Sequence, residues 1–79
     1  MKSIYCTGPL GKVGWVSSWD FDQTDHTKVV RIRLTLNHLK AYRFAPSDEG
    51  TALIGHVLRH IRKHEGTYGS CGVFRWEEP

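Results

Sequence analysis

The sequence predicts a small α+β fold in which an antiparallel sheet of four to five strands carries one amphipathic helix on one face. Three observations lead to this prediction. Apolar and polar residues alternate over residues 30–36, apolar residues recur at helical spacing between residues 47 and 66, and short β-type runs lie near both ends of the chain. The expected order of elements is β-β-β-β-α-β, in a single domain of residues 1–79.

Two short strands are expected in the first quarter of the chain, at residues 3–7 and 13–19. The residues between them are Gly-Pro-Leu-Gly-Lys, a composition typical of a turn, so the two strands should form a hairpin. Three side chains of the second strand are expected on one face of the sheet: Val13, Trp15 and Trp19. The polar and acidic residues 20–27 then form a loop.

Residues 30–36 give the clearest strand signal, because apolar and polar side chains alternate without interruption. The apolar side chains predict one dry face of the sheet: Val30, Ile32, Leu34 and Leu36. Arg31 and Arg33 are expected on the other face. After this strand, Asn37 and His38 either form a tight turn, which makes residues 39–45 a fourth strand, or bend the chain so that one long strand continues.

A helix is expected to begin at Ser47, whose side chain can cap exposed amides, while Asp48 and Glu49 meet the positive end of the helix dipole. Gly66 is the expected stop. The apolar residues of the helix fall on one arc that should pack on the sheet: Leu53, Ile54, Val57, Leu58 and Ile61. A last strand is expected at residues 69–76.

The second half of this helix concentrates the titratable and cationic side chains of the chain. His56, His60 and His64 follow at four-residue intervals and lie along one flank, at the border of the apolar arc. Two histidines at this spacing can chelate a metal, but zinc needs three or four converging ligands, and neither a CxxC nor an HExxH motif accompanies them. We therefore expect no metal or other cofactor, and we interpret the histidines as covering the edge of the contact between the helix and the sheet.

Cys6 and Cys71 are the only cysteines, and the chain begins with neither a signal-peptide pattern nor a continuous apolar segment. A cytoplasmic protein with reduced thiols and no membrane span is therefore expected. If the first and last strands pair, the two cysteines come close enough to bridge. A chain of 79 residues buries a modest core, which a homodimer or a bound partner would supplement.

The formal charge of +3 is unevenly distributed, because residues 28–46 contain five basic residues and no acidic one. A one-sided positive field attracts phosphate backbones or acidic protein surfaces, although a solubilising surface has the same composition. No Walker, nucleophile-elbow or RNA-recognition motif is present. Charge segregation without catalytic spacing therefore favours a binding protein over an enzyme.

The leading hypothesis is a non-enzymatic protein that docks on, or occludes, a nucleic acid, a nucleoprotein complex or an acidic protein surface. An inhibitor of a host-defence complex, of the anti-CRISPR kind, fits this description. The residues expected to bind combine the outer face of the helix with the strand cations and two histidines: Arg59, Arg62, Lys63, Arg31, Arg33, His56 and His60.

The alternative is a small metal-independent ribonuclease of the toxin type, which cuts RNA with histidine, arginine and tyrosine side chains. The chain offers several candidates for such a site: His38, His56, His60, Arg43, Arg75, Tyr42 and Tyr68. Many non-enzymes have the same residues, so composition alone does not separate the two hypotheses.

Overall fold

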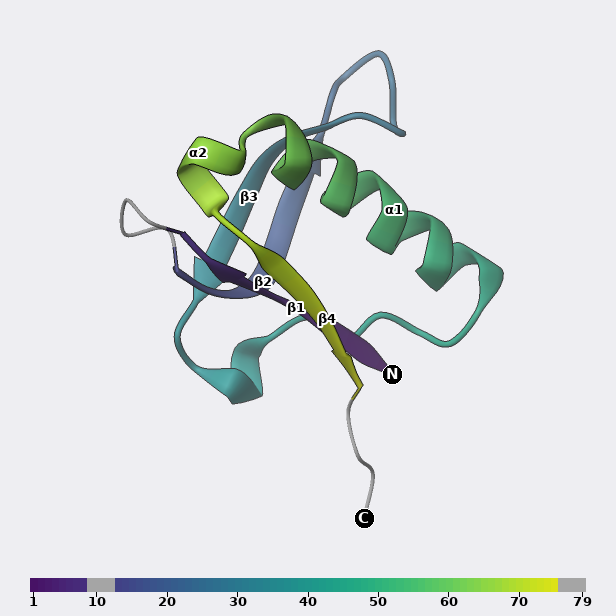
Figure 1. Cartoon of the computed structure of the whole chain (residues 1–79). Coiled ribbons are helices and arrows are strands. Elements are labelled where there is room, and N and C mark those ends of the chain that lie inside the picture. The colour runs from purple at the N-terminus through teal and green to yellow at the C-terminus, as the bar shows by residue number, and fades with distance from the viewer. Residues whose placement is uncertain (9–12, 76–79) are drawn as a thin grey trace.

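An antiparallel sheet and one long helix form two layers in the computed structural model, which describes residues 1–8 and 13–75 (Figure 1). The strands are β1 (Lys2–Thr7), β2 (Val13–Phe21), β3 (Val29–Thr35) and β4 (Cys71–Arg75). The helices are η1 (His38–Lys40), α1 (Asp48–Lys63) and α2 (Glu65–Tyr68). The expected fold class, a small antiparallel sheet with one main helix packed on it, is confirmed.

The strand order is β3-β2-β1-β4, so the first and last strands of the chain lie side by side (Figure 1). β1 pairs with β2 on one edge and with β4 on the other. Most of the turn expected between β1 and β2, and Trp76 at the end of the last expected strand, lie outside the described residues. Within the described residues, no helix is long and apolar enough to cross a membrane.

The fourth strand expected at residues 39–45 is wrong. Asn37 instead caps the short helix η1, because its side-chain oxygen accepts a hydrogen bond from the Leu39 amide at 3.0 Å. In the following segment the Tyr42 amide donates a hydrogen bond to the Val16 carbonyl at 2.9 Å, and Phe44 forms an isolated bridge in which it exchanges two backbone hydrogen bonds with Lys2. β2 does not reach Lys2, so Phe44 satisfies backbone groups that would otherwise lack partners.

A β-bulge changes the dry face predicted for the third strand. Asp20 pairs with Arg31 and Phe21 with Val29, so Val30 is an extra residue on β3. As a result Val29 is 4% exposed and Ile32 is 8% exposed, whereas Val30 is 47% exposed. Leu36 is 76% exposed because β3 ends at Thr35. The predicted burial of Val30 and Leu36 is therefore wrong, whereas Ile32 and Leu34 do face the core.

A second irregularity separates the two tryptophans that were expected on one face. The register of β2 against β3 shifts between Val16 and Ser18, which adds one residue to β2. Trp19 consequently packs on the core side, stacked on Phe44 with ring centroids 5.2 Å apart. Trp15 lies on the opposite face, where its ring contacts Tyr5 at 5.0 Å. Trp15 and Trp19 thus point to different layers.

Helix α1 begins and packs as predicted, but it ends before Gly66, the predicted stop. The Ser47 hydroxyl oxygen accepts a hydrogen bond from the Gly50 amide at 3.1 Å, with Asp48 and Glu49 in the first turn. Val57 and Ile61 are buried in the core, and the other apolar residues of the arc pack around them. Gly66 is not the stop, because the chain continues as α2 to Gly69, which has a φ of 66°.

The two glycines of α1 should respond in opposite ways to alanine. A Cβ at position 50 would clash with the carbonyl oxygen of Ala45, so Gly50→Ala should lower the free energy of unfolding by about 1–3 kcal/mol. Nothing lies within 4 Å of a Cβ at position 55, so Gly55→Ala should raise it by about 0.5–1 kcal/mol. Urea unfolding of both variants tests this pair, and equal effects would contradict the packing of Ala45 against the helix.

Cys6 and Cys71 are free thiols placed directly opposite each other on β1 and β4. The neighbouring Thr7 amide bonds the Ser70 carbonyl at 3.0 Å, which makes the cysteines a non-hydrogen-bonded pair. Such pairs have Cα atoms about 4.5 Å apart, within the range that a disulfide spans. Burial raises the pKa of the Cys6 thiol to about 11 and also raises that of Cys71, so the reactive thiolate is scarce at neutral pH.

Treatment with diamide should therefore form an intramolecular disulfide slowly at pH 7 and about tenfold faster per pH unit above it. The diazene bond of diamide accepts the two hydrogens that the thiols lose. Intact-mass spectrometry should detect the loss of two hydrogen atoms, and the bridge should raise the free energy of unfolding by about 2–4 kcal/mol. Cys71→Ser is the control; if the native chain forms only intermolecular dimers, the strand register is wrong.

Candidate functional site

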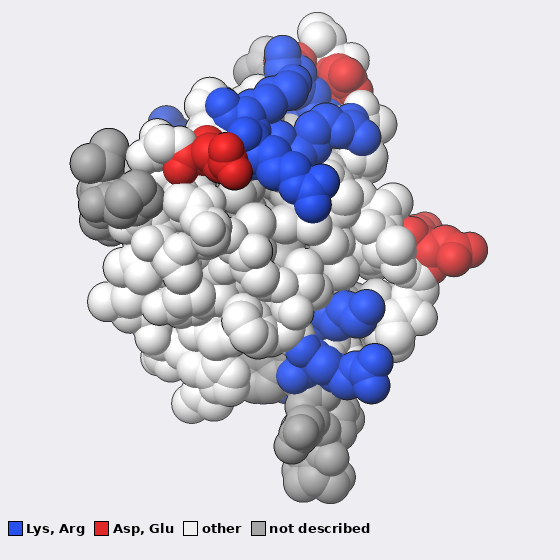
Figure 2. Space-filling model, in the orientation of Figure 1, with Lys and Arg blue, Asp and Glu red and all other residues white. Residues whose placement is uncertain are grey.

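Three exposed cations form a ridge on the outer side of α1, and we call them the basic ridge: Arg59, Arg62 and Lys63. Together with Gly55, which has no side chain, they line a shallow groove of about 460 Å³. Figure 2 shows Lys and Arg side chains gathered over the end of the molecule where α1 and α2 meet. The placement predicted for these three residues from helical geometry is found in the structure.

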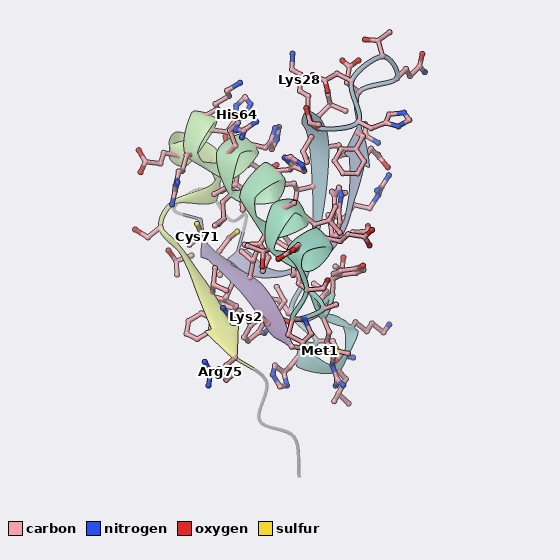
Figure 3. The ribbon with its side chains drawn as sticks, turned by 90° about the vertical axis from the view of Figure 1, so that its right-hand side faces the viewer. Met1, Lys2, Lys28, His64, Cys71 and Arg75 are labelled. Carbon is pink, nitrogen blue, oxygen red and sulfur yellow. The ribbon has the colours of Figure 1, made fainter. Side chains whose placement is uncertain are left out.

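A cleft of about 330 Å³ lies beside this ridge, between α1 and the start of β3, and we call it the α1–β3 cleft. One wall comes from the loop and β3: Asp25, Thr27, Lys28, Val29 and Val30. The other wall comes from α1: His56, Arg59, His60, Lys63 and His64. Figure 3 shows Lys28 and His64 at the same end of the molecule, one from each wall. Arg59 and Lys63 belong to both the ridge and the cleft.

The loop that carries Lys28 is ordered by its own aspartates. Asp22 accepts hydrogen bonds from the amide and hydroxyl of Thr24, and Asp25 accepts the corresponding pair from Thr27, at 3.0 and 2.6 Å. These bonds, with the nearby Lys28, hold the pKa of both carboxyl groups below the usual range. The single ion pair among residues 1–8 and 13–75 is elsewhere, so Lys28 and the basic ridge have no carboxylate within 4.0 Å.

The three histidines differ in their surroundings. Burial lowers the pKa of His60, and the adjacent His64, whose ring centroid is 4.6 Å away, lowers it further. The backbone of Val29, which is close enough to interact with the imidazole, opposes this shift. His56 packs edge-on against Phe21, and its Nδ1 is the one buried side-chain nitrogen or oxygen in the described part of the chain without a hydrogen-bond partner.

The strand cations lie on the opposite face of the sheet from α1. Ile32 points toward the helix, so its neighbours Arg31 and Arg33 point away from it. Arg33 donates two hydrogen bonds to Asp20, at 2.8 and 3.2 Å, and these bonds hold the pKa of the Asp20 carboxyl low. Arg31 acts on the same carboxylate electrostatically. The structure therefore groups two residues of the basic ridge, Arg59 and Lys63, with His56 and His60, and it separates the ridge from Arg31 and Arg33.

Sequence reasoning missed two features of the surface. Lys28 belongs to the cleft because the loop before β3 folds back toward α1, and no sequence pattern marks this approach. An aromatic cluster also covers part of the open face of the sheet, where Trp15 contacts Tyr5, His38 and Phe74 with ring centroids 5.0 to 5.7 Å apart. Strand alternation would have indicated this cluster if the register shift in β2 had been known.

The described residues contain no group of three or more histidine, cysteine or acidic side chains that could hold a metal ion. The residues of the ribonuclease alternative are dispersed. His56 and His60 line the cleft, and Tyr68 lies 5.9 Å from His60. In contrast, His38 contacts Trp15 on the open face, and Tyr42 contacts Trp19 beside the core.

The lowered pKa of His60 predicts a loss of stability in mild acid. Above pH 6.5 both folded and unfolded states hold a neutral imidazole, but below it the unfolded state binds the proton more readily. The free energy of unfolding should fall as the pH drops from 6.5 through the lower pKa of the folded state. His60→Gln should flatten this dependence between pH 7.5 and 5.0 in urea titrations. An unchanged slope in the variant would assign the effect to other groups.

No protein-family model matches the chain, and the comparisons with curated proteins and with solved structures likewise found no match.

Proposed function

We propose that this protein is a non-enzymatic binding protein whose basic ridge docks on the phosphate backbone of a nucleic acid, either free or within a nucleoprotein complex. Occlusion of that nucleic acid is the expected mode of action. The observation that carries the proposal is the concentration of Arg59, Arg62 and Lys63 on one helical face, where none of them forms an ion pair with a carboxylate of residues 1–8 or 13–75. Cations that are not neutralised internally remain available to phosphates.

The chemistry of these side chains favours phosphate as the contacted group. Arginine presents a planar fork of donors that matches phosphate oxygens, and lysine adds a mobile point charge. The shallow groove around Gly55 allows a strand to approach the helix between Arg59 and Arg62. These features support binding through the backbone, and they provide no base-reading element, so sequence-independent binding is proposed.

Arg31 and Arg33 are left out of the proposed docking surface for two physical reasons. They lie on the far face of the sheet, so a partner on the basic ridge does not reach them. They also share Asp20, which bonds Arg33 directly and attracts Arg31. Their field at long range is therefore weaker than that of three cations without paired carboxylates.

Reversing the charge of the basic ridge should abolish binding. In Arg59→Glu/Arg62→Glu/Lys63→Glu, the affinity for a fluorescent single-stranded 12-mer should fall by about 100-fold or more at 50 mM salt, measured by anisotropy. The dependence of log affinity on log salt should become shallower by about 2, because three phosphate contacts are lost. Circular dichroism should show that the fold is retained, since all three side chains are exposed.

The matched control carries the same charge change at exposed positions away from the ridge: Lys2→Glu/Arg31→Glu/Lys40→Glu. This control should keep most of the affinity. Equal losses in both variants would contradict a local docking surface and indicate attraction by net charge alone. An RNA 12-mer incubated with EDTA-treated protein is also run on a denaturing gel. Cleavage that disappears in His60→Ala would support the ribonuclease alternative.

A further inference from the structure

The α1–β3 cleft differs from the basic ridge because cationic residues of two separate elements line one small volume. Lys28 comes from the loop side, and Arg59 and Lys63 come from the helix on the other side. The volume of about 330 Å³ lies at the lower end of the range for small-molecule sites, and it accommodates a phosphate with an attached sugar or ring. A flat track for a continuous backbone would not need cations on two facing walls.

The charge of the cleft is matched to a doubly charged anion. Its lining contains three permanent cations and one carboxylate, Asp25, which leaves two positive charges. Oδ1 of Asp25 accepts hydrogen bonds from both the amide and the hydroxyl of Thr27, and Asp25 forms no ion pair with Lys28. A phosphodiester carries one negative charge and leaves the cleft positive. A phosphomonoester carries close to two near neutral pH and neutralises it.

The histidines would strengthen this match in mild acid. His60 and His64 stand side by side, and their mutual repulsion contributes to the lowered pKa of His60. A bound dianion would favour protonation of His60, which lines the cleft. The other charged or titratable groups around His60 are His56, Arg59 and Lys63 on α1, Lys28 and Asp25 across the cleft, and Tyr68 on α2. Among these only Asp25 would favour proton uptake in the empty cleft.

We propose that the α1–β3 cleft is a phosphomonoester-binding site, and that it selects nucleic acid ends that carry a terminal phosphate. This inference rests on the proposed function for the nucleic-acid part, whereas the phosphate site rests on the cleft alone. The ridge then holds the adjoining phosphodiesters while the cleft holds the end. The two share Arg59 and Lys63, so the cleft is continuous with the docking surface.

The test compares three 12-mer RNAs of one sequence, with a 5′-phosphate, with a 3′-phosphate and with hydroxyl groups at both ends. The wild-type protein should bind at least one phosphorylated form about tenfold more tightly than the hydroxyl form at pH 7. Lys28→Met should remove this preference and leave the affinity for the hydroxyl form nearly unchanged, because Lys28 lines only the cleft. Arg62 lines only the groove, so Arg62→Met should weaken the binding of all three RNAs equally.

Inorganic phosphate provides a second arm, monitored by the NMR shifts of the His60 and His64 rings in wild type and in Lys28→Met. Equal affinity for all three RNAs in both proteins, without a phosphate-induced shift, would overturn the cleft site and leave the proposed function standing. Binding of inorganic phosphate without binding of any RNA would support the site, assign its ligand to a free phosphomonoester and refute the proposed function. No binding in either arm would overturn both.

Discussion

The contact of Val57 and Ile61 with the sheet determines where every charged side chain of α1 lies. Both residues are buried against strands β1, β2 and β3, and each residue along a helix is rotated by about 100° from the previous one. Once these two point inward, Arg59, Arg62 and Lys63 must point outward, and the histidines must lie along the edge. The basic ridge is thus a geometric consequence of a small apolar core.

The same contact leaves the other face of the sheet without a covering layer in the described part of the chain. The strand cations and the aromatic cluster around Trp15 occupy that face. The aromatic rings contact one another, and Arg33 donates hydrogen bonds to Asp20. The basic ridge forms no ion pair within the part of the chain that the structure describes. Two positively charged regions that are similar in composition therefore differ in their ion pairing, and only the structure distinguishes them.

The helix and the first and last strands could be predicted from the sequence because their signals are local. Ser47 caps the amide three residues ahead, and the apolar arc repeats at helical spacing. The bulges could not be predicted, because an extra residue at Val30 is defined only by the pairing of β3 with β2. Because of this extra residue, Val29 packs in the core and Val30 is exposed. The fourth strand failed because Asn37 capped a short helix instead of forming a hairpin turn.

For the candidate site, the ridge followed from the helical wheel, whereas the cleft depends on Lys28 lying near Arg59 and Lys63, which are distant from it in the sequence. An ordinary structural role must also be considered, because cations in the last turn of a helix stabilise its dipole. That role accounts for Arg62 and Lys63, which lie in the last turn of α1. It does not account for Arg59, one turn earlier, or for Lys28, which belongs to another element. The helix dipole leaves unexplained why Arg59 and Lys28 line the same cleft, and the anionic ligand that we propose would account for it.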